Sequence, residues 1–492
     1  MHNPSVKGYA DLFLGLQYGD EGKGRVVDLV SSQYHIIARH NGGPNAGHSV
    51  QANGHSVALH QLPSGVSNPE QELYIGHGCV VDIEALDSEI LEVESALGTN
   101  IRNRLRISAM ASVIQPHHVL LDRATMRNIG TTGKGIGPAY AAQAQRMEQD
   151  RRLDLRIGDL LANPKEAFAT MRMNAATEME RIHSGVYSHD RDEAKRIVAD
   201  YGPLKRMAAI EQAFERLRPS IDIDPLYLCK QIRRGMRVLL EGAQAFGLDR
   251  IYGTPPYVTS SALGSGAALH NAGIPPEYLR HSLGIVKLIP SRVGYGPFVS
   301  EFGGSASEEH CMHDGGATHN RQKERELFEH HLQDMLASGD PLQVGQALRV
   351  MTNEYGVTSG RPRRLGSLDL VQLQTAAKLN GITGIYCTKL DVLSLFSCTQ
   401  DKGIPYVSSY AIEQISVPFA PSTETLLRSV TPQEQISPAF SEDISNVRSA
   451  DALPQEAHAL LKSIEEGVEV PILGTGVGPS REQFIFMCNT PT

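Results

Sequence analysis

The sequence predicts an α/β fold, built as a single large domain around a mostly parallel central β-sheet with helical excursions. Short apolar runs, typical of buried strands, alternate with longer helical patterns that contain no proline. Several glycine-rich loops directly follow these runs, where ligands bind at the carboxyl ends of parallel strands. With 492 residues, of which 41% are hydrophobic and 21% charged, the chain is large enough for such a domain.

The expected elements follow one another along the chain. Strands are expected at residues 12–14, 36–38, 238–240, 382–387 and 470–473. Helices are expected at residues 83–97 and 368–379. Residues 150–235 are rich in charged residues and helix formers, which indicates a solvated helical excursion. Since no Pro/Ser-rich linker divides the chain, we expect residues 1–492 to form one domain.

Composition excludes several classes of partner. The net charge of −9 argues against a nucleic-acid partner, because no basic excess exists to neutralise phosphates. The six cysteines have no CxxC spacing, so neither a zinc ribbon nor a disulfide framework is indicated. No apolar run reaches the ~18 residues that a membrane span needs, and the N-terminus lacks a signal-peptide core. We therefore expect a cytoplasmic protein with no membrane partner.

Residues 304–350 form a second excursion, with a helical pattern at 320–337. The histidines and cysteine at 310, 311, 313 and 319 suggest a metal site, but their spacing matches no standard one. We interpret this stretch as a solvent-exposed insertion.

The most informative stretch is residues 15–24, Gly-Leu-Gln-Tyr-Gly-Asp-Glu-Gly-Lys-Gly. Its glycines allow backbone N–H groups to approach a phosphate, and Lys23 adds the counter-charge. The loop is related to the P-loop but departs from it, because Gln17 stands at the first glycine and Gly24 at the magnesium-binding Ser/Thr. Asp20 offers a carboxylate that can hold magnesium or take a proton. Chemistry on a nucleotide or its acceptor is therefore indicated.

Two further loops resemble phosphate or acid–base sites. Residues 42–49 place His48 28 residues after Asp20, about one β-α-β unit, so that both could lie at one sheet edge. A carboxylate and an imidazole suit a phosphoryl acceptor with an acidic N–H. Residues 130–138, Gly-Thr-Thr-Gly-Lys-Gly-Ile-Gly-Pro, offer N–H and O–H donors suited to a monophosphate.

Each of the other motifs, taken alone, is weaker evidence of function. Asp391, in the Thr-Lys-Leu-Asp run after a strand, can accept from both donors of guanine, which favours GTP over ATP. Three arginines within residues 361–364 suit a dicarboxylate or a phosphate. Turn-like segments complete the set, at residues 241–244, 255–261 and 474–481.

In this order, the motifs resemble those of the adenylosuccinate synthetase family over about residues 9–488. The shared signatures are Gly-Asp-Glu-Gly-Lys-Gly, Asn-Ala-Gly-His, Gly-Thr-Thr-Gly-Lys-Gly-Ile-Gly-Pro, Glu-Gly-Ala-Gln, Pro-Tyr-Val-Thr-Ser-Ser, Gly-Arg-Pro-Arg-Arg and Thr-Lys-Leu-Asp. The segment at residues 59–65 also resembles the family.

The resemblance implies a GTP-dependent, Mg²⁺-requiring ligase of AMP biosynthesis. IMP, L-aspartate and GTP would give adenylosuccinate, GDP and phosphate through a 6-phosphoryl intermediate. Asp20 would take the N1 proton of IMP, and His48 would act as acid. Lys23 would neutralise charge on the phosphates. Magnesium would be held by Asp20 and the carbonyl of Gly47.

The resemblance also implies a set of binding residues and a homodimer. IMP would contact Asn45, Thr132, Gln244, Thr259 and Val293, together with Arg146 from the neighbouring subunit. Aspartate would contact Ser359, Arg361 and Arg363. GTP would contact Gly22, Lys23, Gly24, Lys389, Asp391, Gly478 and Pro479.

Departures from the family pattern keep two alternatives open. The unusual residues are Tyr18, Arg25, Pro44, Ala245, Ser359 and Ser367, and the 304–350 stretch is longer than the family's connection. One alternative is a synthetase for another 6-oxopurine nucleotide such as dGMP, although phage enzymes of that type tend to lose the loop aspartate. The other is a non-catalytic GTP-binding paralogue, which would be expected to lose Asp20, His48 or the arginines.

Overall fold

The computed structural model describes residues 8–52, 55–125, 131–187, 191–313, 318–356 and 360–487. The chain forms two compact units of interleaved segments. Unit 1 consists of residues 1–13, 24–243 and 259–280, and unit 2 of residues 14–23, 244–258 and 281–492. The α/β class is confirmed, whereas a single catalytic domain over residues 1–492 stays a prediction.

Unit 1 is built on strands in the order β11-β7-β5-β2-β12-β1, with parallel pairing from β11 to β12. These strands are β1 (Tyr9–Gly15), β2 (Ile36–Arg39), β5 (Glu72–Ile75), β7 (Leu105–Ser108), β11 (Ile221–Asp222) and β12 (Arg237–Ala245). Three two-stranded pairs accompany them, β3 (His48–Ala52) with β4 (His55–Leu59), β6 (Val80–Val81) with β8 (Ser112–Val113), and β9 (Met147–Glu148) with β10 (Arg151–Arg152).

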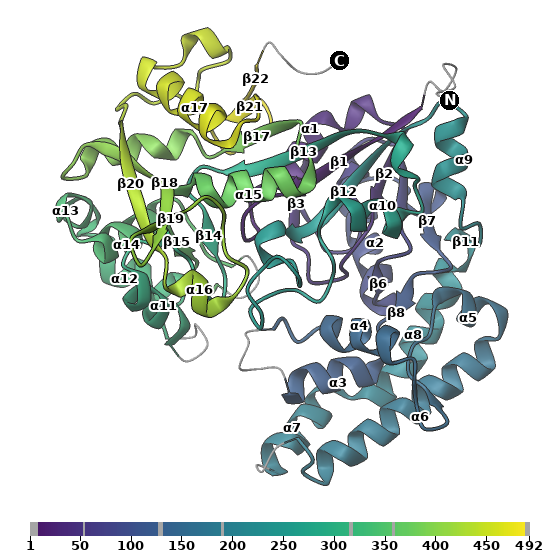
Figure 1. The fold of residues 1–492 in the computed structure, drawn as a ribbon. Helices are drawn as coiled ribbons and strands as arrows, with labels where there is room; N and C mark the ends of the chain where they lie inside the picture. Colours follow the sequence, from purple (N-terminus) through teal and green to yellow (C-terminus); the bar gives the residue numbers. More distant parts are fainter. Residues whose placement is uncertain are drawn as a thin grey trace. The chain divides into compact units, whose positions relative to one another are not determined.

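The helices of unit 1 include a group between β8 and β12 that packs together, as Figure 1 shows for α3, α6 and α8. The helices are α1 (Lys23–Val30), α2 (Ile83–Leu97), α3 (Pro116–Thr125), α4 (Ile136–Gln145), α5 (Ile157–Ala162), α6 (Pro164–His183), α7 (Arg191–Tyr201), α8 (Pro203–Leu217), α9 (Tyr227–Arg233) and α10 (Ser265–Ala272). Helices α5 to α9 therefore lie within residues 150–235, where the sequence predicts a helical excursion.

Unit 2 has strands in the order β13-β17-β21-β22, of which only the last pair is antiparallel. These are β13 (Leu279–Lys287), β17 (Gly384–Thr388), β21 (Ile472–Gly476) and β22 (Phe484–Phe486). Smaller sheets contain β14 (Ser291–Arg292), β15 (Arg364–Leu365), β16 (Leu368–Asp369), β18 (Gly403–Ile412), β19 (Ile415–Val417) and β20 (Thr431–Pro438). The helices are α11 (Gly304–Met312), α12 (Arg321–Phe328), α13 (Leu332–Ala337), α14 (Pro341–Met351), α15 (Leu370–Asn380), α16 (Glu424–Arg428) and α17 (Gln455–Val468).

The expected elements are found close to their predicted bounds. The helix at residues 83–97 ends at Gly98, whose φ of 62° glycine adopts at low cost. The helix expected from residue 368 begins at Leu370, because Asp369 caps it by accepting a hydrogen bond from the Gln372 amide at 3.0 Å.

The stretch at residues 304–350 is mostly exposed from residue 321 to 334, as the sequence predicts, but it is buried in other parts. It forms α11 to α14, and Cys311, Glu324 and most of α14 are buried. The apolar residues of α14 pack against α11, α12, α13 and β15, which explains the burial. Within the described part of the chain, no group of histidine, cysteine and acidic residues is arranged to hold a metal ion. No helix there is long and apolar enough to cross a membrane.

Candidate active site

The loop at residues 15–23 leaves β1 in unit 2 and is anchored by Gln17. The Leu16 amide donates to the carbonyl of Ile285, 3.1 Å away. The Gln17 side chain accepts from the Lys287 amide at 2.8 Å and donates to the Lys287 carbonyl at 2.9 Å. Gln17, at the position of the first P-loop glycine, therefore fixes the loop to the end of β13.

The tip of this loop presents Asp20 to solvent. Gly19, Asp20 and Gly22 have φ values of 100°, 59° and 88°, in the left-handed region that glycine and, less readily, aspartate adopt. The Asp20 side chain is 36% exposed. The turn is held by the Gly19 amide, which donates to Glu21 at 2.8 Å, and by the Thr388 hydroxyl, which donates to the Glu21 carbonyl at 2.8 Å.

Lys23 is buried and bonded to Glu21. Its ammonium lies 2.6 Å from the Glu21 carboxylate. A Cβ on Gly15 would lie 2.4 Å from Glu21 Oε2 and 2.8 Å from Lys23 Nζ, so a larger residue at position 15 would shift the ends of both side chains. The structure thus places the loop lysine in a preformed ion pair.

The buried carboxylate of Glu354 contacts three cationic side chains of unit 2. It lies 3.0 Å from Lys287, 2.9 Å from Arg363 and 3.3 Å from Lys389. Arg363 also pairs with Asp20 at 2.8 Å. Burial raises the pKa of Glu354, but Lys287, Lys389 and Arg363 outweigh it and hold that pKa far below its ordinary value. Glu354 is therefore ionised, and its cluster connects the phosphate loop, the arginine motif and the Thr-Lys-Leu-Asp motif.

The Thr-Lys-Leu-Asp motif leaves the carboxyl end of β17, as its sequence predicts. Lys389 has a φ of 67°, and the Leu390 amide donates to the Gly476 carbonyl at the end of β21, 3.0 Å away. The motif therefore lies beside the loop that carries two further GTP candidates, Gly478 and Pro479.

In unit 1, His48 begins β3 and contacts Glu241 at the carboxyl half of β12. His48 Nδ1 lies 2.5 Å from Glu241, which also accepts from the Ser64 amide at 2.8 Å and the Ser64 hydroxyl at 2.5 Å. Burial raises the pKa of Glu241, but His48, Arg39 and Ser64 more than compensate and lower it to about 2. An ionised Glu241 thus accepts the Nδ1–H of His48 and orients the imidazole.

Gly24, which replaces the P-loop hydroxyl residue, is explained by His48. A Cβ at position 24 would lie 2.8 Å from His48 Cβ and 3.2 Å from His48 Cγ. A side chain there would displace the imidazole.

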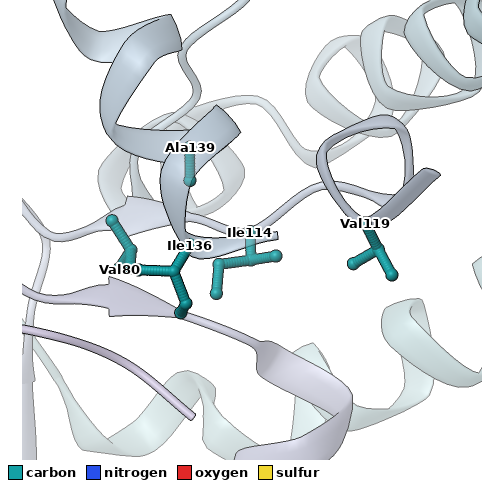
Figure 2. Close-up of a cluster of buried hydrophobic side chains, with 5 residues drawn as sticks. All are labelled: Val80, Ile114, Val119, Ile136 and Ala139. Carbon is teal, nitrogen blue, oxygen red and sulfur yellow. The ribbon is translucent and has the colours of Figure 1, made fainter. Parts of the chain in front are cut away.

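The loop with Asn45 lies beside the loop with Thr132. The Lys134 ammonium donates to the Pro44 carbonyl at 2.7 Å. Ile136 and Ala139 of α4 pack in a buried cluster with three further apolar side chains, as Figure 2 shows. Those side chains are Val80, Ile114 and Val119. The cluster fixes α4, so the two predicted IMP loops of unit 1 are held together.

The remaining candidates differ in how far they are exposed. Arg146 ends α4 and is exposed, with a φ of 66°. Thr259 is half-buried and Val293 is 48% exposed. Both amide atoms of Gln244 are buried and have no hydrogen-bond partner among the residues that the structure describes. Gly47 and Gly22 are exposed, and Arg361 is half-buried. Ser359 lies outside the described residues.

Sequence reasoning assigned no role to Glu21, Glu241 or Glu354, each of which is buried against a candidate residue. Glu241 gave a signal, because it belongs to a motif at the end of a predicted strand. Glu354 precedes the arginine motif by a few residues and gave none, since its partners are distant in sequence.

Replacing Glu241 with glutamine is expected to lower kcat by about 10- to 100-fold, the usual effect of losing a carboxylate that orients a functional histidine. The KM values should stay within about twofold of the parent, because Glu241 is fully buried and bonds His48 and Ser64. Steady-state kinetics test this, with Glu70→Gln, an exposed glutamate of unit 1, as the control. Equal changes in both variants would contradict the role.

Comparisons with known proteins give the same family over nearly the whole chain. A family model described as adenylosuccinate synthetase matches residues 12–485. Adenylosuccinate synthetase 2 of Cupriavidus pinatubonensis is 36% identical over 483 residues and covers 98% of both chains. The solved structure of fully ligated adenylosuccinate synthetase from Plasmodium falciparum has a TM-score of 0.76 and 28% identity, covering 98% of this chain and 100% of that one. Cyanophage S-2L succinoaminodeoxyadenylate synthetase, bound to dGMP and dATP, shares the fold at a TM-score of 0.57 and 16% identity, with 97% and 95% covered.

Proposed function

Because the chain belongs to the adenylosuccinate synthetase family, we propose that it joins IMP and L-aspartate while GTP is cleaved to GDP and phosphate. It is a ligase of the branch that leads from IMP towards AMP. The observation that carries the proposal is family membership over nearly the whole chain, with the acid–base and charged residues of the reaction retained at their motif positions.

The proposed reaction has two steps. Asp20 takes the N1 proton of IMP, and the 6-oxygen attacks the γ-phosphorus of GTP, which releases GDP. The amino group of aspartate then attacks C6, and the phosphate leaves with the 6-oxygen. His48 hydrogen-bonds the transferring group, and Lys23 neutralises its charge. The exposed Asp20 carboxylate and its contact with Arg363 support its place beside both substrates.

The remaining roles are proposals by motif. IMP is bound by Asn45, Thr132, Gln244, Thr259 and Val293, and aspartate by Ser359, Arg361 and Arg363. GTP is bound by Gly22, Lys23, Gly24, Lys389, Asp391, Gly478 and Pro479. The amide atoms of Gln244 have no partner within the described part of the chain, which supports a ligand there, because buried polar groups ordinarily have partners.

Mg²⁺ and GTP are the cofactor and co-substrate of this family. The donor chemistry fits, because Asp20 offers an exposed, hard carboxylate oxygen of the kind that Mg²⁺ prefers. We propose Asp20 and the Gly47 carbonyl as the protein ligands. When bound, the ion neutralises phosphate charge.

Replacing Arg361 with leucine is expected to raise the KM for aspartate by at least about tenfold, because a charge-assisted hydrogen bond to a carboxylate is lost. The KM for GTP should change little. A change confined to GTP would mean that this arginine faces the other ligand.

Phosphate release by purified protein with Mg²⁺ and GTP tests the function. IMP and dGMP are compared, each with and without aspartate. Release that needs both IMP and aspartate is the expected result. Phosphate release with dGMP only would identify dGMP as the substrate. No release with either nucleotide would indicate a non-catalytic GTP-binding protein. At 16% identity, the phage enzyme bound to dGMP supports the fold alone.

Homodimers are typical of this family. We propose that Arg146 of one subunit reaches the IMP site of the other, which its exposure at the end of α4 supports. We further propose a cytoplasmic location, in keeping with a reaction that uses free nucleotides and aspartate.

A further inference from the structure

The helices α11 to α14 contain a buried cluster centred on Glu324, apart from the residues assigned above. The Glu324 carboxylate accepts from Arg349 at 2.7 and 2.8 Å and from the Tyr355 hydroxyl at 2.6 Å. His310 Nε2 lies 2.6 Å from the same carboxylate. Burial raises the pKa of Glu324, but these partners outweigh it and lower it to about 2. Glu324 is therefore an ionised carboxylate with each oxygen held.

This cluster is connected to both arms of the arginine loop, defined here as residues 354–356 and 360–363. Tyr355 lies in the first arm, and Arg349 Nη1 donates to the Arg363 carbonyl in the second, 3.2 Å away. The Arg321 amide, at the start of α12, donates to the Gly360 carbonyl at 3.0 Å. The first amides of a helix have no partner within that helix, and here the Arg321 amide bonds the loop instead.

Adjacent residues of the first arm face different charge clusters. Glu354 contacts Lys287, Arg363 and Lys389, whereas Tyr355 contacts Glu324. Side chains of neighbouring residues in extended backbone point to opposite faces. The arms of the arginine loop are therefore held between the Glu354 cluster on one face and the Glu324 cluster on the other.

We propose that Glu324 is a positioning residue for the aspartate-binding loop, and that the 304–350 stretch serves to order the two arms of this loop before the substrate arrives. A buried ion pair contributes little net stability compared with an apolar replacement, so its presence needs another reason. Fixing Arg363 and its neighbour Arg361 in advance reduces the ordering cost of binding a dicarboxylate. The inference rests on the proposed function.

The test is the Glu324→Gln variant, which keeps the side-chain shape and removes the charge. The KM for aspartate should rise on the order of tenfold, the effect of one charged hydrogen bond, while the KM values for IMP and GTP stay within about twofold. Amide hydrogen exchange at Gly356 and Gly360 should become faster. Glu329→Gln, an exposed glutamate of the same insertion, should leave all of these values unchanged.

Tyr355→Phe repeats the test with a milder change, should Glu324→Gln fail to fold. It removes one hydrogen bond to Glu324 and should raise the KM for aspartate by about threefold. An unchanged aspartate KM in a folded variant, or an equal rise for all substrates, would overturn the inference. Failure of the proposed function is distinguishable, because the parent enzyme would then release no phosphate with IMP, GTP and aspartate.

Discussion

Replacing Asp20 with asparagine is expected to lower kcat by about 100- to 10,000-fold, the usual contribution of a general base. Asparagine has nearly the same shape and tolerates the left-handed backbone at position 20, where φ is 59°. It cannot take the N1 proton of IMP. Single-turnover phosphate release measures the loss, and calorimetry should find GTP and IMP affinities within a few-fold of the parent.

Asp401→Asn, an exposed aspartate of the same unit, is the control and should retain full activity. Turnover of Asp20→Asn at the parent rate would remove Asp20 from the base role. Loss of IMP and GTP binding in that variant would instead mean that its contact with Arg363 organises the loop.

The Glu354→Gln variant is expected to lose about 3–5 kcal/mol of unfolding free energy, because it leaves buried cations without their counter-charge. Lys287 is 2% exposed and has a pKa already lowered by burial. The KM values for aspartate and GTP should rise together, since Arg363 and Lys389 share this carboxylate. Urea unfolding measures the stability, with Glu329→Gln as the control. Parent-like stability would contradict the role of Glu354.

The same carboxylate predicts a pH dependence. Its pKa in the folded protein lies far below the ordinary value of 4.5, so the unfolded chain binds a proton more readily. The stabilisation is therefore complete above about pH 4.5 and is lost as the pH falls below it. The difference in unfolding free energy between the parent and Glu354→Gln should shrink as the pH is lowered from 7 to 4. A constant difference would contradict this.

The fold could be predicted from local patterns wherever apolar periodicity and caps agree. The helix at Ile83–Leu97 has an N-cap, Asp82, and a glycine at its end, and its predicted bounds match. Residues 304–350 are expected to be exposed because their histidines and cysteine match no metal-site spacing and the flanks resemble a surface loop, yet part of the stretch is buried. The charges of Glu324 and Arg349 are buried against each other, and one-dimensional polarity cannot show such a pair.

The candidate site was predictable where its residues lie in glycine-rich loops at strand ends. The contacts of Asp20, Lys23 and His48 with other residues could not be predicted. Asp20 pairs with Arg363, Lys23 with Glu21 and His48 with Glu241. The pairing of His48 with Glu241, for example, depends on the order of the strands in unit 1. The effect of Gly24 likewise depends on the position of His48.

The central claim is that the 6-oxygen of IMP is phosphorylated and leaves as part of phosphate. IMP labelled with ¹⁸O at the 6-position tests this most directly, in a reaction with GTP, aspartate and Mg²⁺. The account predicts one ¹⁸O atom in each phosphate released, detected by mass spectrometry, and adenylosuccinate free of that label. Unlabelled phosphate, formed while the 6-oxygen stays on the purine, would contradict it and identify the protein as a GTP hydrolase.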